Sequence, residues 1–197
     1  MRRDDRPARP VARAAGHPNA PLARRYAAVV YESLLITALV LVTGFLTLPV
    51  VSPPVANATH ALEVPAAPAR ILSACVVFGI AGLYCVWSWA GGRRTLSMKT
   101  WRLSLVRRDG GTVDTRTAIV RYLALWIAPL TALVAYEALK PSGLGNHALW
   151  LIGLNYVWAL VDPDRQFLHD RIAGTRIIWE RSSAEGPVAE AAAKPGA

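Results

Sequence analysis

Five polar side chains in or beside apolar stretches have the character of a functional cluster: Arg25, Glu32, Arg121, His169 and Asp170. A charge placed in hydrocarbon costs about 2.5–3.5 kcal/mol on insertion scales, so such residues are usually paired or functional. Arg25 and Glu32 share one helical face, but their seven-residue separation puts their backbones about 10 Å apart along the axis. We therefore predict that Glu32 pairs with Arg121 across two helices. We also predict that Asp170 is structurally required, because it lies just beyond the last apolar run and can close the C-terminal segment onto basic groups of the first and third helices, where Arg25 and Arg121 emerge. In the alternative, Arg121 snorkels to the headgroups and Glu32 is neutral or faces a water-filled notch.

The segment 162–175 (DPDRQFLHDRIAGT) concentrates carboxylates around His169, a composition that could in principle ligate a divalent ion. The chain has four histidines, and the other three lie in the N-terminal arm or in outer loops: His17, His60 and His147. Because no histidine set can be assembled, we predict that Asp162 or Asp164 caps a short helix that Gly174 ends. The sequence contains no nucleophile motif, phosphate loop or dinucleotide fingerprint, so we expect no enzyme activity, no cofactor and no metal.

The composition indicates that the bilayer is the solvent of this chain. Hydrophobic residues make up 53% of the sequence and charged residues 18%, while the net charge is +9 and the pI is about 10.3. The cations cluster at the ends of apolar runs and form no basic stripe with interleaved aromatics, which argues against nucleic-acid binding. Cys75 and Cys85 are ten residues apart in one apolar run, a spacing that fits no metal or redox motif.

Four apolar runs are candidate membrane helices, and we expect them near residues 26–48, 71–90, 118–139 and 147–161. A helix needs about 20 apolar residues to cross the hydrocarbon core, and the first three runs meet this length. Pro129 lies within the third run and predicts a kink, because proline removes a backbone donor. The fourth run is short enough to be tilted, re-entrant or buried.

The distribution of cations supports a fourth span. Seven arginines precede the first run, and seven cations lie in the loop 91–117. The other two loops hold only Arg70 and Lys140, whereas four arginines follow the fourth run. Cation-rich and cation-poor segments alternate only if four spans place both termini in the cytoplasm.

The basic loop and the two ends of the chain have their own patterns. Alternating apolar residues from Trp101, followed by Asp109-Gly110-Gly111, predict a short β-hairpin or an extended segment against the membrane face, with an amphipathic interfacial stretch as the alternative. Residues 1–20 are expected to form a disordered basic arm, and residues 181–197 a disordered tail.

Three segments together resemble the RDD family of small membrane proteins: RYAAVVYE from Arg25 to Glu32, the basic loop up to Arg121-Tyr-Leu, and the segment 162–175. By this resemblance residues 21–180 form an RDD-like transmembrane domain, in which Arg25 and Asp170 match two of the three name-giving residues. Glu32 stands where the family has an Asp, which keeps the charge but adds a methylene. The resemblance implies a membrane role that is mostly unassigned, with transport, including cation/proton exchange, suggested for some members.

We therefore expect an all-α integral membrane protein, a small bundle of about four transmembrane helices with a basic cytoplasmic loop. The leading hypothesis is a multi-pass protein of the cell membrane that is transport-related, through an intramembrane Arg/Glu/Asp cluster. The alternative is a non-transporting interaction or assembly protein whose basic cytoplasmic face binds anionic lipid or a partner complex. The expected partners are the lipid bilayer, anionic headgroups and further copies of the chain, and no nucleic acid.

Overall fold

The computed structural model describes residues 18–51 and 66–180, with the side chains of 49–51 left out. Most of the arm expected over 1–20 and the tail expected over 181–197 lie outside the described residues. The helices and strands follow one another as α1 (Leu22–Val51), α2 (Ala67–Trp89), α3 (Leu96–Thr100), β1 (Leu103–Arg107), α4 (Thr115–Leu125), α5 (Ile127–Leu139), α6 (Gly145–Ala148), α7 (Leu154–Val161), α8 (Leu168–Ala173) and β2 (Thr175–Trp179).

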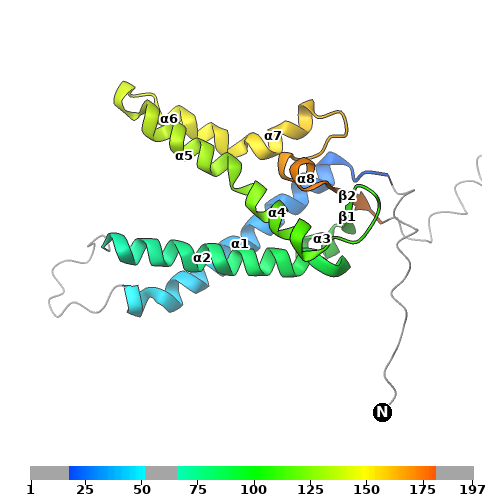
Figure 1. The fold of residues 1–197 in the computed structure, drawn as a ribbon, viewed down its shortest axis with the longest axis horizontal. Helices are drawn as coiled ribbons and strands as arrows, with labels where there is room; N and C mark the ends of the chain where they lie inside the picture. The colour runs from blue at the N-terminus through cyan, green and yellow to red at the C-terminus, as the bar shows by residue number, and fades with distance from the viewer. Residues whose placement is uncertain (1–17, 52–65, 181–197) are drawn as a thin grey trace, which may run out of the picture.

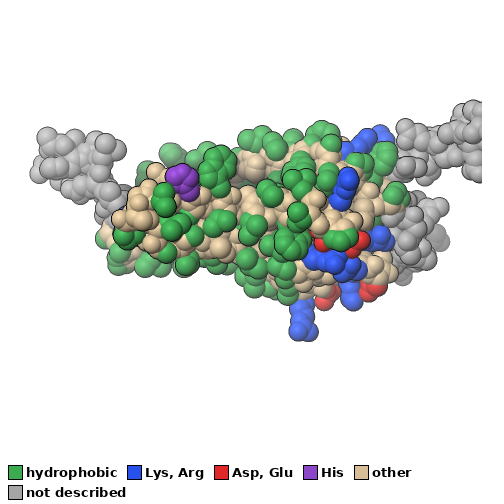
Figure 2. All heavy atoms as spheres, turned by 90° about the horizontal axis from the view of Figure 1, so that it is seen from above, with side chains coloured by type: hydrophobic (Ala, Val, Ile, Leu, Met, Phe, Trp, Pro, Cys, Tyr) green, Lys and Arg blue, Asp and Glu red, His purple; other side chains and the backbone are tan. Residues whose placement is uncertain are grey.

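Within the described residues, three helical segments are long and apolar enough to cross a membrane: Leu22–Leu48, Ala67–Gly92 and Thr115–Ser142. Hydrophobic side chains cover the surface along these helices, whereas most of the charged side chains gather at the end that carries the sheet (Figure 2). We call this end the sheet end. The expectation of an all-α membrane protein is confirmed, because an apolar surface of this extent needs lipid around it.

The fourth apolar run is helical but is not one continuous α-helix. It consists of α6, a 3₁₀ segment over Leu149–Gly153 and α7, and it packs along α5 (Figure 1). Large apolar side chains such as Trp150 and Leu160 are exposed on its surface. Its length falls short of that of the three long helices, so a fourth full span stays a prediction.

The kink expected in the third run is present, one turn before Pro129. The helix breaks at Trp126, between α4 and α5. Proline has no N–H to donate to the carbonyl four residues earlier, which here belongs to Leu125. Asn155 of α7 replaces that donor, because its Nδ2 lies 2.8 Å from the Leu125 carbonyl oxygen. The short fourth run is thereby fixed to the break in the third.

We expect Asn155→Leu to lower the free energy of unfolding by about 1–2 kcal/mol, because it leaves the Leu125 carbonyl without a donor. Pro129→Ala restores a backbone N–H that can reach this carbonyl. Chemical unfolding in detergent should therefore give a smaller cost for Asn155→Leu in the Pro129→Ala background than in the wild type. Strictly additive costs would contradict the compensation.

The two strands form an antiparallel pair, in which Leu103 lies opposite Trp179 and Arg107 opposite Thr175. The hairpin expected within the basic loop is therefore wrong in its pairing. The turn at Asp109-Gly110-Gly111 exists, with Gly110 at a φ of 85°, but the chain continues from it into α4. The partner of β1 is the C-terminal strand, a pairing between distant segments that local periodicity does not reveal.

The sheet end joins three distant parts of the chain. The backbone N–H of Ala20, just before α1, donates to the Ile177 carbonyl of β2 at 2.9 Å. β2 in turn pairs with β1, which leads toward α4. The first turns of α1 and α4 and the short α8 are thus held around one point (Figure 1).

Candidate functional site

Asp170 lies at the centre of the sheet end and has no exposed surface. It sits in α8, which Gly174 terminates in the left-handed region at a φ of 65°, as the sequence predicted. Glycine adopts this conformation without the penalty that a Cβ imposes, so the chain can turn directly into β2. This turn brings Thr175, the first residue of β2, back onto Asp170.

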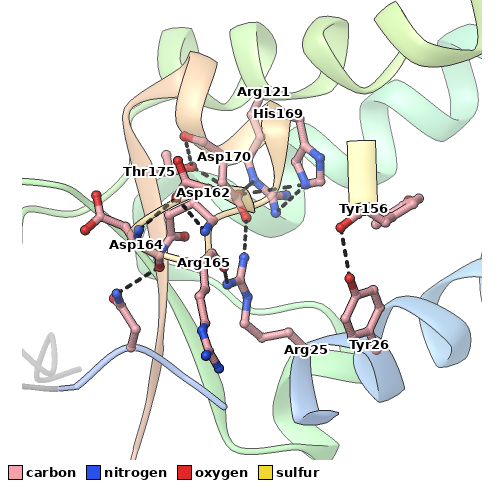
Figure 3. Close-up of polar contacts among 12 residues, drawn as sticks. Arg25, Tyr26, Arg121, Tyr156, Asp162, Asp164, Arg165, His169, Asp170 and Thr175 are labelled. Carbon is pink, nitrogen blue, oxygen red and sulfur yellow. Dashed lines mark hydrogen bonds and ion pairs between the residues drawn. The ribbon is translucent and has the colours of Figure 1, made fainter. Parts of the chain in front are cut away.

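The Asp170 carboxylate binds two buried arginines from two other helices (Figure 3). Its Oδ2 accepts a hydrogen bond from Arg25 Nη2 at 3.2 Å, and its Oδ1 accepts one from Arg121 Nε at 2.8 Å. Thr175 Oγ1 also donates to Oδ1, at 3.2 Å. One carboxylate therefore fixes α1, α4 and α8 together, and we call Arg25, Arg121 and Asp170 the clamp.

Aromatic rings complete the surroundings of both guanidinium groups. Arg25 lies over the Phe167 ring at 4.2 Å and Arg121 over the Trp89 ring at 4.1 Å. Arg25 Nη1 also donates to the Arg165 carbonyl. Cation–π contacts of the guanidinium groups with aromatic rings stabilise cations that have lost their water. The clamp therefore persists although both arginines are almost completely buried.

His169 is neutral in this environment. Its Nε2 lies 3.3 Å from Arg121 Nη2, which can only donate, so Nε2 accepts and the ring proton resides on Nδ1. Burial, helped by the Arg121 and Arg25 charges and opposed by Asp170, lowers the pKa of His169 to about 3. For Asp170 burial alone would raise the pKa, but Arg121 and the neighbouring cations bring it down to about 2.

The predicted pair of Glu32 with Arg121 is wrong. Arg121 is taken by Asp170 and His169 and is only 4% exposed, so it does not snorkel either. Glu32 Oε2 accepts a hydrogen bond from Ser97 Oγ, because α3 packs against α1 at this point. Its Oε1 is buried and has no hydrogen-bond partner of ordinary geometry within 18–51 and 66–180, although the Tyr84 hydroxyl of α2 also interacts with the Glu32 carboxylate.

A cavity of about 290 Å³ connects Glu32 with the clamp. Its charged lining comes from Arg25, Glu32 and Arg121, and His169 adds a neutral polar group. Much of the remaining wall is apolar and includes Ala28, Ile36, Cys85, Trp89, Met98, Leu125 and Phe167. The alternative in which Glu32 faces a hollow therefore fits the structure better than the ion pair.

The other carboxylates of segment 162–175 have structural roles. Asp162 Oδ2 accepts hydrogen bonds from the backbone N–H groups of Asp164 and Gln166. It therefore caps the turn before α8, whereas the prediction was that it caps the helix itself. Asp164 binds the guanidinium groups of Arg108 and Arg171. Among the described residues no group of three or more potential ligands could hold a metal ion.

Of the five residues singled out from the sequence, four form one hydrogen-bonded group and Glu32 lies across the cavity from it. Sequence reasoning missed Ser97, which orients Glu32, and Thr175, which orients Asp170. It also missed Asn155. A signal for Asn155 exists in the sequence. Pro129 leaves one backbone carbonyl without its usual donor, and an uncharged polar residue within an apolar run can supply a donor to it.

The model of the RDD family matches residues 19–174, a stretch that contains α1 to α8 and both sides of the cavity. Neither the curated proteins nor the solved structures yielded a match to this chain. Because the family model covers most of the chain, this multi-pass membrane protein belongs to the RDD family.

Proposed function

We propose that this protein is transport-related, and that Glu32 is the group that binds the transported ion or small solute. One observation carries the proposal: Glu32 lies in a membrane-spanning helix beside a cavity, and its buried Oε1 accepts no hydrogen bond of ordinary geometry from the described residues. A carboxylate in hydrocarbon costs about 2.5 kcal/mol or more, and an unsatisfied polar atom adds to this cost. Binding of a ligand at Glu32 Oε1 would offset this cost and explain why position 32 carries a carboxylate.

The clamp is the scaffold of the proposed site. Asp170 is committed to both arginines, and its lowered pKa keeps it charged, so it is a poor proton carrier in the physiological range. Glu32 has one hydrogen-bonded oxygen and one that is not, so a ligand can approach it without breaking the clamp.

We place both termini in the cytoplasm of a cell-membrane protein. The sheet end carries Arg93, Lys99, Arg102 and Arg116 on its exposed surface, as the positive-inside rule expects of a cytoplasmic face. The cavity then lies at the cytoplasmic end of the bundle. Because three long helices and a shorter fourth span form only a small bundle, a complete path across the bilayer would be formed with further copies of the chain.

The proposal predicts that Glu32→Gln in proteoliposomes lowers ion or solute flux at least tenfold, because the ligand loses its charged partner. Glu137→Gln is the matched control, since Glu137 lies on α5 with 61% of its side chain exposed next to Lys140. Flux equal in wild type and Glu32→Gln would contradict the proposal.

The basic face gives the second candidate function, binding of anionic lipid without transport. Arg93 stacks on the Trp87 ring at 4.8 Å, at the end of α2, where aromatic and basic side chains meet the headgroups. Retention on vesicles that contain phosphatidylserine, combined with no flux in any variant, would favour this candidate.

A further inference from the structure

The lining of the cavity carries charges of both signs. Arg121, held by Asp170, and Glu32, held by Ser97, both line it. Both act electrostatically on Cys85, which also lines the cavity. The distance between Glu32 and Arg121 exceeds that of a salt bridge, so the two charges face the same space without neutralising each other directly.

Both charged residues keep a hydrogen-bonding atom in reserve. Arg121 donates through Nε to Asp170 and contacts His169 through Nη2, while its Nη1 donates no hydrogen bond within the described part of the chain. Glu32 Oε1 accepts no hydrogen bond of ordinary geometry from the described residues. The cavity therefore offers a cationic donor and an anionic acceptor at the same time.

The net charge of the residues that line or support the cavity limits which ligands can bind in it. The arginines Arg25 and Arg121 are balanced by Asp170 and Glu32, and the low pKa of His169 keeps that ring neutral. A ligand with a net charge would leave one uncompensated charge among apolar walls, which is costly. A ligand with one positive and one negative group leaves none.

We infer that the cavity binds a small zwitterion, with its ammonium group at Glu32 Oε1 and its carboxylate at Arg121 Nη1. The inference rests on the proposed function and names the substrate class of that site. The volume of about 290 Å³ is at the lower end of the range of small-molecule pockets, about 300–1,000 Å³. Apolar lining residues such as Ala28, Ile36 and Leu125 suit an apolar side chain on the ligand.

The test uses the purified full chain in detergent and equilibrium binding of radiolabelled glycine, leucine and phenylalanine. At least one should bind, and Glu32→Gln should weaken that binding at least tenfold, whereas Glu137→Gln should leave it unchanged. Because Arg121 also holds Asp170, its role is tested by changing the ligand. The amide of the bound amino acid lacks the carboxylate and its N-acetyl form lacks the ammonium, so both should compete at least tenfold more weakly.

Each outcome decides the inference. No binding of any of the three amino acids would overturn it, and so would equal competition by the amide, which would identify a cation site, or by the N-acetyl form, which would identify an anion site. Glu32-dependent cation flux without amino-acid binding would leave the transport proposal standing and refute the zwitterion. Amino-acid binding without flux would support the zwitterion and refute transport.

Discussion

Asp170→Asn is expected to lower the free energy of unfolding by about 3–5 kcal/mol, the largest effect of any single substitution considered. Asp170 forms ion pairs with two almost fully buried guanidinium groups, and removal of one partner of a buried ion pair leaves the other charge uncompensated. Here both arginines lose their partner at once. The unfolding midpoint of the protein in mild detergent measures the loss.

Asp109→Asn is the matched control. Asp109 lies in the exposed turn after β1 and pairs with Arg107, whose side chain is also largely exposed. A solvated pair of this kind contributes about 0–1 kcal/mol. Equal midpoints for the two variants would contradict a clamp at Asp170.

Acidification from pH 6.5 to pH 4.5 is expected to remove about 2–3 kcal/mol of stability through His169, since one pKa unit corresponds to about 1.4 kcal/mol. The folded pKa of His169 is lowered to about 3 by burial, against an ordinary value of 6.5. In this window the unfolded chain binds a proton that the folded protein excludes. The contribution is complete above pH 6.5 and is lost as the pH falls toward 3.

Asp170 affects the free energy of unfolding in a lower pH range than His169. Its pKa is lowered to about 2 from 3.8, so its contribution is complete above pH 3.8 and is lost below it. In His169→Gln, which keeps an acceptor for Arg121, the dependence between pH 6.5 and 4.5 should therefore flatten. His147→Gln, at an exposed position, should keep the wild-type slope. An unchanged slope in His169→Gln would show that other groups set the acid sensitivity.

The long helices could be predicted from the sequence because span length and apolar composition are local properties. Gly174 as a helix end and the kink near Pro129 follow from backbone chemistry in the same way. The pairing of β1 with β2 could not be predicted, since it joins segments about seventy residues apart and each is only five residues long. The meeting of α8 with the first and third long helices at Asp170 was predicted nevertheless, because Asp170 follows the last apolar run directly, and the ion pairs with Arg25 and Arg121 confirm it.

The members of the site and the partners of Asp170 could be predicted, whereas the partner of Glu32 could not. Arg25, Arg121, His169 and Asp170 stand out because charges near hydrocarbon need partners. Which carboxylate takes which guanidinium depends on how α3 packs against α1, and that places Ser97 beside Glu32. A hydroxyl in a short polar segment has no distinctive signal in one sequence, so the partner of Glu32 could not be inferred.

Asp170 and Glu32 thus have separate roles, with Asp170 holding the fold and Glu32 left available to a ligand. Gln at position 32 can still accept from Ser97, so Glu32→Gln should change the free energy of unfolding by less than about 1 kcal/mol. The flux reduction expected for this variant would then be a loss of ligand binding, with the fold retained.

The most direct test of this account is the flux of Glu32→Gln in proteoliposomes, expressed per folded protein as determined on the same preparation. The account predicts a flux at least tenfold below that of the wild type at an almost unchanged unfolding midpoint. A wild-type flux per folded protein in Glu32→Gln would contradict the proposed role of Glu32.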